Sequence, residues 1–115
     1  MIGWAVVLNT QLKAHKQFGE LHVGTLVDCL GPVQGAPLIV EAAERFLEGR
    51  GVDLIISNQC HESWRSALLG LGFLEGPSNY VVAVSPELSK LLHPFDRNAS
   101  QIHLTRGDGD GPIHL

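Results

Sequence analysis

His61 is the side chain in this sequence best suited to proton transfer at neutral pH. An unperturbed imidazole titrates near pH 6.5, so it can either accept or donate a proton there. His61 follows a turn at Asn58-Gln59 and begins a helix predicted over residues 61–71. We therefore predict a catalytic acid or base at this position. A surface residue in a first helical turn explains the same pattern, and both interpretations stay open.

A second candidate site lies at the start of another predicted helix. Gln34, Gly35 and Ala36 precede Pro37, and proline is favoured in a first helical turn although it lacks an N–H. The free amides of a helix start, at the positive end of its dipole, attract phosphate groups. We predict an anion contact from Gln34 and from the amides of Gly35, Ala36 and Leu38. An ordinary proline-started helix remains the alternative.

Histidine, cysteine and acidic residues show no metal-binding pattern elsewhere. No two histidines lie four residues apart on a predicted helix, and none pairs with a cysteine at ligand spacing. Asp108 and Asp110 lie in GDGDG without the twelve-residue pattern of a calcium loop. We therefore expect no metal. Cys29 and Cys60 stand alone, and we interpret both as small core residues rather than as reactive thiols.

Hydrophobic patterning predicts the order β-β-α-β-α-β, followed by a short helix and a short strand. The polar residues 9–20 are interpreted as a hairpin connection or an irregular loop, and broken alternation near Gly24 and Thr25 indicates a bulge. This order predicts an α/β fold with a mixed sheet and helices packed on it. The predicted strands cover residues 2–8, 21–30, 52–57, 79–85 and 101–105, and the predicted helices cover residues 37–48, 61–71 and 86–92.

The stretch over residues 21–84 resembles the acetyl-CoA-binding half of the GNAT N-acyltransferases. The matching segments are LHVGTLVDCL, GAPLIVEAAERFLEGRG, VDLIIS and SWRSALLGLGF, in that order and ending on Gly72-Phe73. The resemblance covers a little over half of the chain. It implies a GNAT-like half-domain that lacks the first strands and helices of that fold.

Acetyl-CoA is the cofactor that this resemblance implies. In the family the pantetheine arm lies along the bulged strand, which corresponds here to Val27, Asp28 and Cys29, and the pyrophosphate meets the following helix start. The family's frequent general acid, a tyrosine, corresponds to Leu68, and its asparagine corresponds to His61. Two functions remain open. One is an acyl-CoA-dependent N-acetyltransferase completed by dimerisation, and the other is a non-catalytic module that binds a small ligand or a protein.

Length and charge limit the other possibilities. The 115 residues fit one domain, and a net charge of −4 without a dense Lys/Arg stripe argues against a nucleic-acid partner. No apolar run reaches the ~20 residues that span a bilayer, and the start lacks a signal-peptide pattern, so we expect a cytoplasmic protein with no membrane partner. Half a GNAT sheet would leave an unpaired strand edge and one uncovered helix face. This predicts a symmetric homodimer, joined either through a strand edge or through apolar surface near Trp4.

Overall fold

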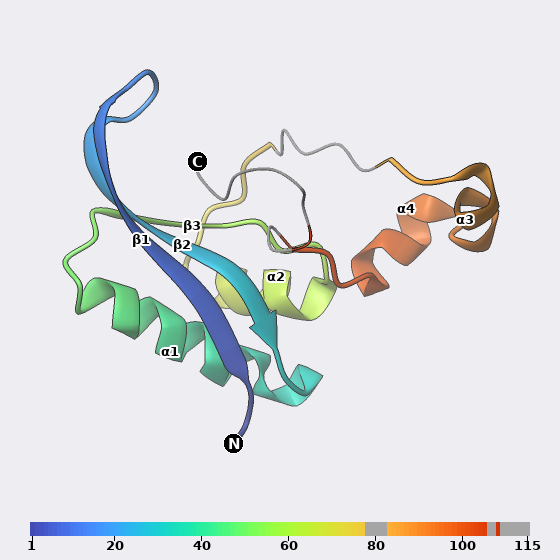
Figure 1. Ribbon diagram of the computed structural model, residues 1–115. Helices are drawn as coiled ribbons and strands as arrows, with labels where there is room; N and C mark the ends of the chain where they lie inside the picture. The colour runs from blue at the N-terminus through green and yellow to red at the C-terminus, as the bar shows by residue number, and fades with distance from the viewer. Residues whose placement is uncertain (78–82, 106–107, 109–115) are drawn as a thin grey trace.

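Two long antiparallel strands form the centre of the sheet. In the computed structural model, which describes residues 1–77, 83–105 and 108, β1 (Trp4–His15) pairs with β2 (Gly19–Leu30). Figure 1 shows their hairpin extending beyond the helices. Of the two predictions for residues 9–20, the hairpin connection is confirmed, but the turn itself covers only residues 16–18, because β1 continues to His15. The irregular loop was wrong. Alternate side chains of β1 face solvent, and polar residues are tolerated at those positions.

The bulge in β2 lies at Val27, where the register against β1 shifts by one residue. The predicted position near Gly24 and Thr25 was wrong by about three residues. Gly24 instead provides room for a helix, since a Cβ atom there would lie 3.0 Å from both δ carbons of Leu47. The pairs that flank the bulge are Val6 with Asp28 and Val7 with Leu26.

A third strand, β3 (Leu54–Ser57), joins the other side of β2 in parallel. The connection between them contains a 3₁₀ turn, η1 (Val33–Gly35), and the helix α1 (Ala36–Glu48). The strand order is therefore β1-β2-β3, with one antiparallel and one parallel pairing. This arrangement confirms a mixed sheet within an α+β fold.

The core lies between this sheet and two helices, α1 and α2 (Glu62–Gly70). Both helices form close to their predicted bounds, and Trp64 and Leu68 of α2 are buried. On α1, Val40 is fully buried while Phe46 is half exposed. Burial of Cys29 as a core residue is also confirmed. The buried cluster contains Leu26, Cys29, Ala36, Ile39, Val40, Ala43, Trp64, Ala67 and Leu68.

The chain after α2 contains short helices and extended segments. α3 (Pro86–Leu91) confirms the short helix predicted over residues 86–92, and Ser85 caps it, since Ser85 Oγ accepts the Leu88 N–H at 3.2 Å. The sequence did not predict α4 (Phe95–Asn98) or η2 (Ala99–Gln101). Within the described residues, no helix has both the length and the apolar character needed to cross a membrane.

The two predicted C-terminal strands have different outcomes. The strand over residues 101–105 was wrong, because Gln101 ends η2 and residues 102–105 join no sheet. The side chain of His103 in this segment contacts Asp28 of β2. Of the strand predicted over 79–85, residues 79–82 lie outside the described residues. Residues 83–85 form no strand.

Candidate functional site

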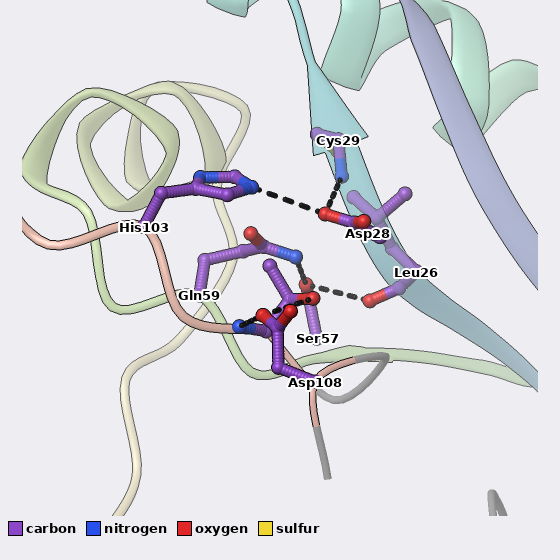
Figure 2. Close-up of polar contacts among 8 residues, drawn as sticks. Leu26, Asp28, Cys29, Ser57, Gln59, His103 and Asp108 are labelled. Carbon is purple, nitrogen blue, oxygen red and sulfur yellow. Dashed lines mark hydrogen bonds and ion pairs between the residues drawn. The ribbon is translucent and has the colours of Figure 1, made fainter.

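The parallel strands β2 and β3 stop pairing after Leu26 and Ser57. Beyond that point β2 continues past its bulge to Leu30, whereas the chain after β3 turns toward α2. Ligands of open α/β sheets gather outside the carboxyl ends of parallel strands, so polar groups at this place merit a functional interpretation. We call this region the β2–β3 fork and define it by Asp28, Ser57, Gln59 and His103 (Figure 2).

Ser57 and Gln59 form one side of the fork. Ser57 Oγ donates to the Leu26 carbonyl at 3.0 Å, and Gln59 Nε2 donates to Ser57 Oγ at 3.2 Å. The other amide atom, Gln59 Oε1, is buried and has no hydrogen-bond partner among the described residues. A buried acceptor without a partner is costly, so a ligand N–H group reaching it would form a favourable bond.

Asp28 and His103 form the other side. Asp28 Oδ1 accepts the Cys29 N–H at 2.8 Å and lies 3.1 Å from His103 Nε2. Because an ionised carboxylate can only accept, Nε2 of a neutral His103 carries the proton and Nδ1 keeps its lone pair. The two side chains are 26% and 33% exposed, so they remain accessible to solvent. The imidazole also meets Trp64 edge-on, with ring centroids 6.3 Å apart.

The thiols of both cysteines lie outside the hydrogen bonds of the fork. Burial, and secondarily the charge of Asp28, raises the pKa of the Cys29 thiol to about 12. Cys29 is therefore a neutral thiol in the core at physiological pH, and only its amide faces a fork residue. Cys60 Sγ donates to the Ala99 carbonyl at 3.1 Å and so ties the chain after β3 to η2.

His61 has a structural role in the local fold. It is the N-cap of α2, where its Nδ1 accepts the Ser63 N–H at 3.2 Å. Within the described part of the chain, no hydrogen bond or ion pair joins it to Asp28 or His103. Leu68, at the position of the family's tyrosine, is buried in the core and offers no proton. The sequence-predicted catalytic group therefore lies outside the fork cluster.

The predicted phosphate site at the start of α1 has fewer free donors than expected. The Gly35 N–H donates to the Pro32 carbonyl at 2.8 Å, and the Ala36 N–H donates to the Val33 carbonyl. Both amides are thus occupied by the 3₁₀ turn that precedes the helix. Gln34 and Leu38 are exposed and could still meet an anion.

A hollow of about 550 Å³ lies beside this helix start, between α1 and α2. Its size is suitable for part of a small ligand. Glu62 lines it, and a carboxylate at this position repels a phosphate. The remaining lining residues are Val33, Pro37, Ser63, Ser66, Ala67, Gly70 and Leu71.

Three of the sequence-predicted binding residues lie on β2 at the fork. Val27 forms the bulge and is buried, while Asp28 and the Cys29 amide take part in the polar cluster. Residues 34–38 lie at the separate helix start. Sequence reasoning missed Ser57 and Gln59, although polar residues directly after a predicted strand are a usable signal. Nothing local could have placed His103, which is 75 positions from its partner Asp28.

No three metal-binding side chains gather in the described part of the molecule. Comparisons with models of known protein families, with curated proteins and with solved structures find no match for this chain. A functional interpretation therefore depends on the contacts of the fork and on the sequence resemblance.

Proposed function

We propose that this chain binds acyl-coenzyme A at its β2–β3 fork and transfers the acyl group to an amine, as GNAT-like N-acyltransferases do. The observation that supports this is the separation of two parallel strands after Leu26 and Ser57, with a bulge in β2 at the next residue. This is the feature on which the pantetheine arm lies in the family that the sequence resembles. Pantetheine carries amide groups, so an extended arm can pair with strand backbone as an added strand does.

Hydrogen-bonding groups for such an arm are present at the fork. Gln59 Oε1 is a buried acceptor without a partner in the described chain. The Cys29 amide and the Leu26 carbonyl are capped by the side chains of Asp28 and Ser57. A ligand N–H can replace the Ser57 hydroxyl at the Leu26 carbonyl, so this exchange leaves the backbone carbonyl satisfied, while Asp28 keeps its contact with the Cys29 amide.

The phosphate end of the ligand should contribute less. Gly35 and Ala36 already use their amides, and Glu62 lines the neighbouring hollow. We expect Gln34 and the first free amide of α1, at Leu38, to supply the remaining anion contacts. Most of the affinity should therefore come from the pantetheine arm, and pantetheine itself should compete with acetyl-CoA.

A second candidate function is a non-catalytic module that binds the same ligand. The specific observation in its favour is the buried Leu68 at the position where the family often has a proton-donating tyrosine. Both functions require binding, and they differ in whether the protein releases thiol from acetyl-CoA when an amine is present.

Ligand-dependent melting tests the binding step. Acetyl-CoA at about 100 Kd should stabilise the fold by about 2.7 kcal/mol. The variant Gln59→Leu removes the buried acceptor at similar volume and should reduce the shift, whereas Gln11→Leu on exposed β1 serves as the control. ADP should shift melting less than pantetheine does. An unchanged melting temperature with millimolar acetyl-CoA and coenzyme A would contradict the proposal.

A further inference from the structure

We propose that His103 is the catalytic base of the fork, that Asp28 positions it, and that the acyl acceptor is a cationic amine. This inference rests on the proposed function, because it needs an acyl-CoA thioester beside the fork. It assigns the proton transfer to a residue other than His61. Three observations support it: the geometry of the His103–Asp28 pair, the charge around that pair, and the fact that the other candidate groups are buried or already hydrogen-bonded.

The pair has the geometry of an oriented base. His103 Nε2 lies 3.1 Å from Asp28 Oδ1, and the edge-on contact with Trp64 further restricts the imidazole. With Nε2–H bound to the carboxylate, Nδ1 is the atom left to accept a proton. No described residue hydrogen-bonds Nδ1. A carboxylate that holds one ring nitrogen also stabilises the imidazolium that forms when the other is protonated.

Asp28 is itself held in place from the β2 side. Its Oδ1 accepts the Cys29 N–H at 2.8 Å immediately after the bulge. The Asp28 carboxylate therefore connects β2 with His103. In the proposal, the thioester arm lies along β2 and His103 accepts the proton. Figure 2 shows His103 pointing toward Asp28 from the C-terminal segment, across from β2.

Charge around the pair favours a cation. Asp108 Oδ2 accepts the Thr105 N–H at 2.8 Å, which brings a second carboxylate into the region of Figure 2. Among the described residues, no ion pair joins a lysine or an arginine to Asp28 or Asp108. A diamine or polyamine can present one neutral amine to the thioester while a second, protonated amine meets these carboxylates.

The proposed step balances as follows. The lone pair of the neutral amine attacks the thioester carbonyl carbon, so an N–C bond forms and the C–S bond then breaks. His103 Nδ1 takes the proton that the amine nitrogen loses. The departing thiolate takes a proton from the His103 imidazolium, which restores the neutral base and gives an amide and free coenzyme A.

Other candidate groups are less available for this role. His61 uses Nδ1 to cap α2. The Cys29 thiol is fully buried, and Cys60 donates to a backbone carbonyl. Among the described titratable side chains of the fork itself, His103 is the one that combines solvent access with an oriented, unused nitrogen.

Thiol release from acetyl-CoA with putrescine, spermidine and glucosamine as acceptors tests the inference on the 115-residue chain. His103→Gln keeps a hydrogen-bonding side chain but cannot act as a base, and it should lower kcat by roughly a hundredfold or more. Asp28→Asn should lower kcat with little change in the KM for acetyl-CoA. His15→Gln, at the far end of the β1–β2 hairpin, should match wild type.

The melting shift with acetyl-CoA is measured on the same variants and separates two kinds of failure. A retained shift in His103→Gln together with the lost turnover supports the base. Equal turnover in wild type and His103→Gln, or binding without thiol release in wild type, overturns this inference and leaves the binding function intact. Absence of any melting shift in wild type overturns the proposed function, and this inference with it.

Discussion

His22 and Asp53 form two hydrogen bonds with each other at the point where β2 and β3 begin to pair. The His22 N–H donates to Asp53 Oδ2 at 2.9 Å, and the Asp53 N–H donates to the His22 carbonyl at 2.7 Å. The His22 ring adds a contact of 2.9 Å from Nδ1 to the Gly51 carbonyl. The first β2–β3 pair, Val23 with Leu54, follows directly. This reciprocal contact sets the register that ends at the fork.

Replacing Asp53 by alanine should destabilise the fold. The change removes the acceptor of the His22 N–H, and such a bond contributes about 1 kcal/mol to the free energy of unfolding. Urea denaturation followed by circular dichroism measures the loss. Glu20→Ala, at an exposed position of β2, is the matched control and should stay within about 0.5 kcal/mol of wild type. Equal midpoints for both variants would show that the contact does not stabilise the register.

His61→Ala should reduce stability because His61 caps α2. Loss of a side-chain cap costs about 1 kcal/mol, and His61→Asn should recover most of it because asparagine is a favoured cap. The position alone, in a first helical turn, predicts an exposed residue with little effect on stability, and the cap changes that expectation. Thermal denaturation of the two variants beside wild type checks this. If alanine and asparagine behave alike, the cap contributes nothing.

The two thiols should react at very different rates. Cys29 is fully buried, whereas Cys60 is partly exposed, so a thiol reagent at pH 8 should label Cys60 in the folded protein and Cys29 only after unfolding. Cys60→Ser should remove the fast phase, and Cys29→Ala should leave it unchanged. Mass spectrometry of the labelled peptides identifies each site. Rapid labelling of Cys29 under native conditions would contradict its placement in the core.

Stability should fall at alkaline pH through the same cysteine. Burial raises the pKa of the folded Cys29 thiol to about 12, while an unfolded thiol ionises near about 8.5. Below both values the thiol is neutral in each state, and above the lower value only the unfolded state loses its proton. The free energy of unfolding therefore decreases as pH rises from about 8.5 toward 12. Cys29→Ala should show a shallower decrease between pH 8 and pH 10, and parallel curves would argue against this origin.

We predict that the protein forms a homodimer through the edge of β1. In the described part of the chain β1 pairs only with β2, and from Trp4 to Leu12 it contains none of the charged residues or prolines that protect edge strands. Trp4 and Val6 are 43% and 45% exposed. Two copies of β1 can pair antiparallel about a two-fold axis, because such an interface is self-complementary.

A hollow of about 390 Å³ beside this edge would be covered in the same dimer. It lies between β1 and α1, and its lining includes Trp4, Leu38 and Phe46. Light scattering at tens of micromolar should give twice the mass of the chain, and Val6→Lys should shift the equilibrium toward monomer. Gln17→Lys, in the exposed hairpin turn, adds the same charge as a control. A monomeric wild type at that concentration would exclude this interface.

Apolar spacing predicted the helices well because a helix needs only local hydrogen bonds and one buried stripe. Proline and serine near the start of α3 and glycines after α1 gave bounds within a residue or two of those observed. The hairpin was harder to predict. Residues 9–15 are mostly polar, and their strand exists because β2, which follows directly after the turn at residues 16–18, supplies hydrogen-bond partners.

The bulge position also depended on tertiary contacts. Irregular alternation showed that β2 could not be regular throughout, but it could not distinguish Val27 from Gly24. Packing decides between them, because Gly24 is needed where Leu47 crosses the strand. The extra residue falls at Val27, directly beyond the last β2–β3 pair.

The sequence by itself determined which segments are apolar enough to form a core, where the two main helices lie, and that β2 carries a break near the residues implicated in binding. Tertiary structure alone decided which polar groups meet at that break. Asp28 and His103 are brought together by the path of the chain after α2, and His61 is drawn into a helix cap instead. Local sequence patterns predict helices, because a helix depends on residues that are close in the sequence. A site brings together residues that are far apart in the sequence, so no local pattern predicts it.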